Sequence, residues 1–489
     1  MIAGDIKTAA VIGAGVSGLA AAKCLRQIGV KCEIFDRSPK LGGVWAAGYH
    51  GYGVQVQKDL YEFPDFPLPP GVSDFTAGPV FQEYLEDYCS HFGLRDSLRL
   101  SSRVIAVRRS GQGWILDVER NGETVQLQAD LVVAATGLYS ETPNIPVVDG
   151  QEQFAGEIWH SSEMADAEML RGRRVAVVGY GKSATDIAGA AAEVADEVHL
   201  VFRTAHWPVP RRLLGLLPFK WGMLTRLVAA MIPPYVHASP AVRALHSAGY
   251  PLPWLFWRIV ELLLRTQQGL GTEISNGKTL VPDHPVEIDA FSEVTMVPRP
   301  GFIDLIRRKE ILAHRSAIEG FNETGLVLEE GGALPVDSVV FGTGWKPGHG
   351  YLPEDTRKAL EEEADGFYLY RHILHPNVPN LAFIGWSSSF MSVTTFALQA
   401  RWLVEAVAGR VVLPSQGEMR QEISRLRAWK QSWMPEGRAL SATLLLHMAH
   451  YHDELLEDMK ADPLRKTGLL APLKEILVPY QASDFRDVA

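Results

Sequence analysis

Two glycine-rich loops, each between a short apolar strand and a helix, constrain the fold of this chain more than any other feature. In the first, the apolar run 9–12 leads into Gly-Ala-Gly-Val-Ser-Gly at 13–18, a helix-compatible segment follows to residue 28, and a second strand ends at Asp36. A strand–helix–strand unit of about 30 residues with this loop is typical of dinucleotide binding.

Each glycine of the first loop has a physical reason. Gly13 permits the tight turn, Gly15 lets the backbone approach a pyrophosphate, and Gly18 packs the helix on the strand. The helix N-terminus adds free N–H groups and the positive end of its dipole. Asp36 follows about 20 residues later, where a carboxylate can hydrogen-bond a ribose diol. We therefore predict a dinucleotide site here.

A second unit of the same kind lies in mid-chain. A strand at 174–178 leads into Gly-Tyr-Gly-Lys-Ser-Ala at 179–184, followed by a helix-compatible run at 185–195 and a strand at 197–202. Arg203 stands where the first unit has Asp36, and a guanidinium suits the 2′-phosphate of NADP. The alternative is a solvated surface arginine. Lys182, Thr204 and Arg211 are weaker phosphate candidates.

Two dinucleotide sites in one chain imply electron transfer between two cofactors. The first cofactor could be NAD or FAD. The turn Gly42-Gly43-Val44-Trp45 favours a flavin, because a glycine pair lets the chain pass close to a flat ring system that Trp45 could cover. The alternative is a turn with a buried tryptophan.

Composition excludes several other classes of function. The 489 residues carry a formal net charge of −10, which argues against binding nucleic acid or anionic lipid through bulk charge. No uninterrupted run of 18 apolar residues and no targeting segment is visible, so we expect no transmembrane span. The three cysteines form no CxxC pair, which favours a reducing compartment and argues against a disulfide reductase.

Further motifs resemble those of the flavin-containing monooxygenases, the class B flavoprotein monooxygenases. The segment 154–164, from Phe154 through His160, is similar to their F-x-G-x-x-x-H-x-x-x-aromatic fingerprint, and similar likenesses occur at 65–67, 135–137, 381–386 and 399–402. Two positions depart from the family pattern. Met164 replaces the aromatic residue that ends the fingerprint, and Gln55 replaces an asparagine that many members have.

The resemblance implies an NADPH- and O2-dependent FAD enzyme that oxygenates a small organic substrate through a C4a-(hydro)peroxyflavin. N- or S-oxygenation is the first expectation, and Baeyer–Villiger or carbon-hydroxylating oxygenation is the alternative. An alternative of another class is an NADPH-dependent flavin reductase or oxidase, or an NADPH-binding redox sensor. We expect a cytoplasmic homodimer that uses O2 and a small molecule and binds no nucleic acid.

The predicted site residues follow from the motifs and the resemblance. Gln55 is the predicted catalytic residue, and no metal is expected. The predicted cofactor-binding residues are Gly13, Gly15, Val16, Ser17, Gly18, Asp36, Arg37, Gly43, Val44, Trp45, Gln55, Val104, Gly179, Gly181, Lys182, Ser183, Ala184, Arg203, Thr204, Arg211 and Gln399.

The expected fold is α/β, with two doubly wound, Rossmann-like dinucleotide-binding domains. An NADPH domain at 169–329 is inserted in a discontinuous FAD domain formed by 1–168 and 330–489, which includes a C-terminal tail. Within the NADPH domain, a segment at about 205–268 is rich in tryptophan and proline. It could form a lid over the substrate or a subunit interface, a membrane-surface patch, or plain core.

Overall fold

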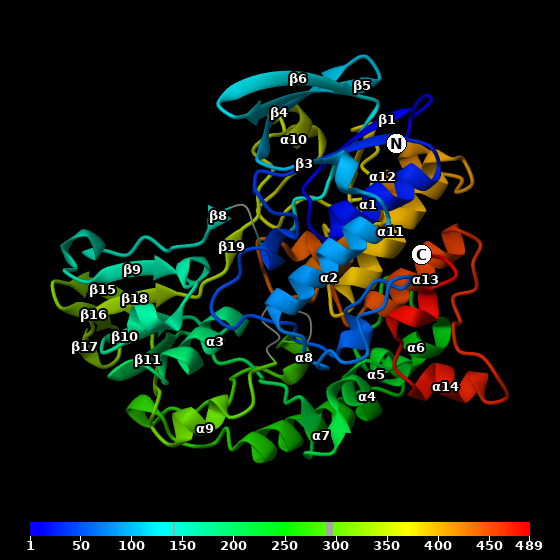
Figure 1. Ribbon diagram of the computed structural model, residues 1–489. Coiled ribbons are helices and arrows are strands. Elements are labelled where there is room, and N and C mark those ends of the chain that lie inside the picture. Colours follow the sequence, from blue (N-terminus) through cyan, green and yellow to red (C-terminus); the bar gives the residue numbers. More distant parts are fainter. Residues whose placement is uncertain (140–141, 290–296) are drawn as a thin grey trace.

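A computed structural model of the protein describes residues 1–139, 142–289 and 297–489. Within these residues, two parallel five-stranded sheets form two lobes (Figure 1). The first sheet has the order β20-β7-β1-β2-β3. Its strands are β1 (Thr8–Ile12), β2 (Lys31–Phe35), β3 (Leu98–Arg99), β7 (Leu131–Ala134) and β20 (Leu381–Phe383).

The first strand–helix–strand unit forms as predicted from the sequence. Helix α1 (Val16–Gln27) connects β1 to β2, and the two strands pair in parallel with Val11 opposite Ile34. The apolar run in β1 is buried on both faces, as expected of a parallel strand covered by helices. The buried face of α1 packs against α11 (Ser392–Val407). This lobe therefore contains segments from both the N-terminal and the C-terminal parts of the chain.

The second sheet has the order β14-β11-β10-β18-β9, with every pair parallel. Its strands are β9 (Glu157–His160), β10 (Arg174–Val178), β11 (Glu197–Phe202), β14 (Leu312–Arg315) and β18 (Ser338–Phe341), and α3 (Lys182–Ala191) connects β10 to β11. Because β18 pairs with both β10 and β9, this sheet takes in strands on either side of the range 169–329. The division into domains stays a prediction.

Smaller sheets lie at the edges of the two lobes. Two are antiparallel and three-stranded: β4 (Ser102–Ser110), β5 (Gly113–Arg120) and β6 (Glu123–Ala129); and β15 (Ile318–Asn322), β16 (Gly325–Leu328) and β17 (Gly332–Pro335). The two-stranded pairs are β8 (Thr142–Pro143) with β19 (Trp345–Lys346), and β21 (Ser388–Ser389) with β22 (Thr443–Leu445).

The segment 205–268 forms a hairpin and four helices along the lower edge of Figure 1. They are β12 (Arg212–Leu213), β13 (Leu217–Pro218), α4 (Phe219–Met223), α5 (Arg226–Met231), α6 (Pro240–Leu245) and α7 (Pro251–Gln268). The remaining helices are α2 (Gly78–His91), α8 (Val286–Asp289), α9 (Phe302–Arg307), α10 (Glu354–Ala359), α12 (Gln416–Gln431), α13 (Met448–Asp458) and α14 (Ala471–Leu477).

The C-terminal tail packs against this segment through one buried arginine. Arg226 in α5 forms a bidentate ion pair with Asp453 of α13, with both N–O distances 2.7 Å. Its Nε also donates hydrogen bonds to Glu475 and to the hydroxyl of Tyr480. These contacts attach the C-terminal tail to the 205–268 segment. Across the described ranges, the structure contains no helix that is long and apolar enough to cross a membrane.

Candidate functional site

The loop between β1 and α1 accepts only glycine at two of its positions. Gly13 has a φ of +112°, and a Cβ there would overlap the carbonyl oxygen of Ala135. A Cβ on Gly18 would overlap the carbonyl oxygen of Gly13. Helix α1 begins directly after Gly15, which has no side chain to cap it, so the first N–H groups and the positive dipole end face outward. This cradle fits a pyrophosphate.

Asp36 lies beside this cradle, directly after β2. One of its carboxylate oxygens accepts a hydrogen bond from the N–H of Ala14 at 2.7 Å, and the other accepts from the N–H of Ser38 at 2.8 Å. The bonds fix the carboxylate at the mouth of the loop, where its other lone pairs can accept hydrogen bonds from a ribose. Arg37 follows on the exposed surface, whereas Val104 is buried in β4.

The predicted glycine turn lies against the same loop. The N–H of Gly42 donates to the carbonyl of Ala14 at 2.9 Å. A Cβ on Gly15 would lie only 3.7 Å from the Cα of Gly43, so the two backbones nearly touch. A side chain on either Gly15 or Gly43 would therefore fill part of the space beside the loop that a pyrophosphate would occupy. Of the other predicted residues, Val16 and Ser17 form the start of α1.

Trp45 points into the protein rather than toward open space. Its side chain is 9% exposed, and its ring packs against those of Phe81, Tyr61 and Tyr52 at centroid distances of 4.6, 5.7 and 6.0 Å. This environment favours the alternative of a buried tryptophan. The neighbouring Val44, at 45% exposed, faces outward. Contact of either side chain with a flavin stays a prediction.

A turn at residues 385–387, in the C-terminal part of the chain, packs against the first loop. A Cβ on Gly385 would lie 3.0 Å from the Cβ of Ser17. The fully buried amide of Gln399 accepts a hydrogen bond from the Gly385 N–H at 3.0 Å and donates to the hydroxyls of Tyr451 and Ser387. Gln399 therefore holds the 385–387 turn in place through its hydrogen bonds. Sequence reasoning did not reveal this role.

The second loop repeats the steric pattern of the first. Gly179 has a φ of +127°, and a Cβ there would lie 2.6 Å from the carbonyl oxygen of Gly342. Gly181 precedes α3 without a capping side chain, and Ser183 is partly exposed in the first turn. Ala184 is fully buried, and a Cβ on Gly342 would meet its Cβ at 2.6 Å. The alanine is accommodated because glycine faces it from β18's end.

Arg203 and Thr204 lie exposed directly after β11, next to the second loop. The N–H of Gly179 donates to the carbonyl of Val201 at 2.9 Å, which holds the end of β11 beside the loop. This placement suits contact with the 2′-phosphate of a nucleotide. Arg211 lies further along, half-buried, with its guanidinium 4.0 Å from the ring centroid of Phe75.

Lys182 does not extend freely from the second loop. Its ammonium forms an ion pair with Asp186, which is 1% exposed and also contacts Arg299 at 3.2 Å. The hydroxyl of Tyr49 donates to the same carboxylate at 3.0 Å. Burial lowers the pKa of Lys182, and the negative charge of Asp186 partly offsets this shift. These four residues form the Asp186 cluster.

The Asp186 cluster joins the two lobes, and sequence reasoning found only Lys182. Tyr49 comes from the turn after the first loop, and Arg299 also donates to the carbonyl of Gly51 in that turn. The only available signal was the four-residue spacing between Lys182 and Asp186, which places both on one helix face.

A cavity of about 680 Å³ opens beside the Asp186 cluster. Its described lining includes polar groups from both lobes and from the 205–268 segment: Gln57, Asp74, Arg211, Lys220, Arg299 and Asp304. The ammonium of Lys220 also pairs with Asp59, which ties α4 to the first lobe. Part of the tryptophan- and proline-rich segment therefore lines the cavity.

The predicted catalytic residue, Gln55, is not among the described residues that line this cavity. Gln55 is half-buried, and its amide oxygen accepts a hydrogen bond from the N–H of Val297 at 3.4 Å. Gln57, two residues on, lines the cavity itself, and its buried amide oxygen has no hydrogen-bond partner among the described residues. Sequence reasoning missed Gln57. The segment bends at residues 55 and 56, so a strand-like alternation of residues could not have revealed it.

Sequence comparison places the chain beside flavin-dependent oxygenases. The profile of the family described as "Flavin-binding monooxygenase-like" matches residues 6–238 and 307–472. A protein of Arabidopsis thaliana named "Probable flavin-containing monooxygenase 1" is 30% identical, covering 98% of this chain and 96% of its own length. "Flavin-containing monooxygenase 3" of Canis lupus familiaris is 27% identical, covering 94% and 83%.

Solved structures share the fold. The polycyclic ketone monooxygenase of Thermothelomyces thermophila superposes with a TM-score of 0.73 at 18% identity, covering 94% of this chain and 89% of that one. The S-allyl-L-cysteine S-oxygenase of Allium sativum gives a TM-score of 0.65 at 19% identity, covering 95% and 90%. At such identities the likeness establishes the architecture of two Rossmann-type lobes.

Proposed function

The chain belongs to the flavin-binding monooxygenase-like family, and on that premise we propose that it oxygenates a nitrogen or sulfur atom of a small organic molecule. It is a flavin-dependent oxidoreductase with FAD and NADPH as its cofactors. The observation that carries the proposal is the cavity of about 680 Å³, lined by residues of both lobes and by Arg299 of the Asp186 cluster.

The choice of nitrogen or sulfur rests on chemistry and on the relatives. An oxygen-transferring flavin enzyme acts as an electrophile toward soft lone pairs and needs no metal or nucleophile triad for that step. A human relative, 26% identical over 94% of this chain, is named as a putative N-oxide-forming dimethylaniline monooxygenase. The garlic structural neighbour is named as an S-oxygenase.

The residues at the first loop fit FAD. The sterically required glycines leave room beside Gly15 for a pyrophosphate, and Asp36 presents a fixed carboxylate to a ribose. At the second loop, the N-terminus of α3 would hold the pyrophosphate of NADPH, and Arg203 would grip its 2′-phosphate. When bound, NADPH supplies a hydride and FAD supplies the reaction with O2.

The chain's own residues would orient these groups and exclude water. The Asp186 cluster holds Arg299 at the wall of the cavity, where its positive charge suits an anionic part of a ligand. Residues of the 205–268 segment, including Arg211 and Lys220, cover the same space as a lid. Gln55 and Gln57 would offer amide hydrogen bonds near the reacting atoms, and a dry pocket limits loss of oxidant to water.

The test identifies the oxygenated product and measures how much of the NADPH consumed leads to product rather than to H2O2. The purified FAD-loaded protein is mixed with NADPH in air, and O2 uptake, NADPH consumed, H2O2 released and oxygenated product are measured with tertiary amines, thioethers and cyclic ketones. We expect amines or thioethers to raise NADPH turnover and give N-oxide or S-oxide without extra H2O2. Ester formed from ketones alone, or H2O2 equal to NADPH with every substrate, would overturn the proposal.

Two finer features of the predicted function remain proposals of the same kind. A homodimer would be seen by light scattering of the purified protein as a mass near twice 53.9 kDa. A cytoplasmic location would be seen by fractionation of the native cells.

A further inference from the structure

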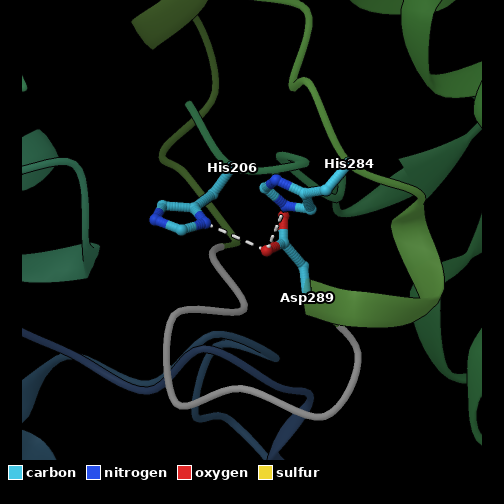
Figure 2. A group of neighbouring side chains, drawn as sticks. All are labelled: His206, His284 and Asp289. Carbon is cyan, nitrogen blue, oxygen red and sulfur yellow. Dashed lines mark hydrogen bonds and ion pairs between the residues drawn. The ribbon is translucent and has the colours of Figure 1, made fainter. Parts of the chain in front are cut away.

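Three potential metal ligands meet at the start of the 205–268 segment, next to the second cofactor loop, where the ring of Tyr180 lies 6.4 Å from that of His206. His206 follows β11, His284 lies in the loop before α8, and Asp289 ends α8. Figure 2 shows the two imidazole rings turned toward one carboxylate. Oδ1 of Asp289 lies 2.9 Å from Nδ1 of His206 and 2.7 Å from Nε2 of His284. The three ligand atoms all lie within 4.8 Å of one another.

The backbone around these side chains is already fixed. Oδ2 of Asp289 accepts a hydrogen bond from the N–H of Trp207 at 2.6 Å. The indole N–H of Trp207 donates to the carbonyl of His284 at 2.8 Å. A carboxylate held by a backbone donor and imidazoles on tethered segments is the arrangement that orients ligands around a metal ion. The ligand set is therefore preorganised.

We propose that His206, His284 and Asp289 bind one divalent transition-metal ion, with Zn²⁺ as the natural occupant. Two imidazole nitrogens and one carboxylate oxygen suit Zn²⁺ and related ions far better than Mg²⁺ or Ca²⁺, which prefer oxygen ligands. Ligand atoms about 2.1 Å from a tetrahedral ion lie about 3.4 Å from each other. The observed separations from Oδ1, 2.9 and 2.7 Å, are shorter, so the side chains would move apart slightly as the ion binds.

Binding requires a change of imidazole tautomer and a small outward movement of the side chains. In the structure, Nδ1 of His206 and Nε2 of His284 are placed to donate to Asp289; around a metal, both must present lone pairs, so each ring carries its proton on its other nitrogen. The side chains of His206 and His284 are 18% and 21% exposed, so an ion can enter and water can complete its coordination.

The sequence pattern predicted no metal, because the ligands are 78 and 5 residues apart and match no compact motif. The site also lies partly outside the family match, since the matched ranges end at residue 238 and resume at 307. His206 lies three residues beyond Arg203. A bound ion would therefore tie the start of the covering segment, and the end of the nucleotide-binding strand, to α8.

The experiment measures metal binding by the FAD-loaded full chain without any turnover. The protein is freed of metal with a chelator, dialysed, and titrated with Co²⁺ and then Zn²⁺. We expect one Co²⁺ per chain, visible as d–d absorption after subtraction of the flavin spectrum, and displacement by one Zn²⁺. His284→Gln and Asp289→Asn should each weaken Zn²⁺ binding at least about 10- to 100-fold.

A matched control comes from a second histidine pair in the same lobe. Nδ1 of His199 lies 3.0 Å from Nε2 of His314, and the one carboxylate that the described structure places at this pair, that of Glu197, contacts the other ring nitrogen of His199 at 3.5 Å. His314→Gln should leave Co²⁺ and Zn²⁺ binding unchanged, and Zn²⁺ should raise the Tm of this variant and of the wild type but not of His284→Gln. The flavin absorbance of each variant verifies its fold. Metal binding below one-tenth equivalent, or equal binding by wild type and His284→Gln, would overturn the proposal and leave a purely hydrogen-bonded cluster.

Discussion

Replacing Asp186 by asparagine tests whether the Asp186 cluster holds the two lobes together. The substitution preserves shape and removes a charge that is 1% exposed and contacts Lys182, Arg299 and Tyr49. Breaking a buried ion pair costs about 3–5 kcal/mol because the partner's charge stays buried. The side chain of Arg299 is 36% exposed and can be solvated, so we expect a loss of about 2–4 kcal/mol in the free energy of unfolding.

The assay is urea denaturation followed by tryptophan fluorescence, with Asp186→Asn, Lys182→Met and the double variant compared in one cycle. The double variant should lose at least about 1 kcal/mol less than the sum of the single losses. Glu354→Gln is the control, because Glu354 and Lys358 have the same four-residue spacing at 72% and 74% exposure. It should cost about 0.5 kcal/mol or less. Equal effects of Asp186→Asn and Glu354→Gln, or fully additive losses, would refute the reasoning.

Four further outcomes can be checked on the same protein. Arg203→Ala should lower kcat/KM for NADPH roughly 10- to 150-fold and leave NADH use nearly unchanged, as steady-state kinetics with both cofactors will show. Gly13→Ala should abolish FAD retention on gel filtration, because φ is +112° and the new Cβ would overlap the carbonyl of Ala135. Gln55→Leu should keep FAD bound and flavin reduction intact while raising H2O2 released per NADPH roughly 5- to 150-fold; an unchanged ratio would remove Gln55 from the mechanism. Burial lowers the pKa of His349 from 6.5 to about 4, so the unfolded chain takes up that proton first as the pH falls. Stability should drop by about 3 kcal/mol between pH 6.5 and 4 on this account, and urea midpoints for His349→Phe should lack that part of the pH slope.

The strand–helix–strand units were predictable because their signals are local. In each unit the glycines, the apolar strands and the residue after the second strand all lie within about 30 positions, and backbone sterics fix what that order can form. The structure accordingly places Asp36 beside the first loop and Arg203 beside the second. Helix α1 even begins at Val16, as the motif requires.

The contacts between the lobes were not predictable, because they join residues far apart in the sequence. Tyr49, Asp186 and Arg299 meet at one point, yet no periodicity links them. Gln399 was expected near the flavin on the basis of a family motif, but its amide hydrogen bonds are made to the turn and helix behind the loop. Side-chain direction at a domain junction depends on tertiary packing, which a single sequence does not display.

The pairing of β20 with β7 has a consequence for how the protein is made. Leu381 lies opposite Val132, so the first sheet cannot be completed until residues 381–383 have been synthesised. At about 5–20 residues per second, synthesis from residue 134 to residue 381 takes about 12–50 s. During that interval the strand Leu131–Ala134 has an open edge, which a chaperone or another nascent chain can occupy. The second sheet, complete once residue 341 emerges, can fold earlier. A nonsense mutation between residues 342 and 380 would therefore release a polypeptide with a finished nucleotide lobe and an unpaired, aggregation-prone partner.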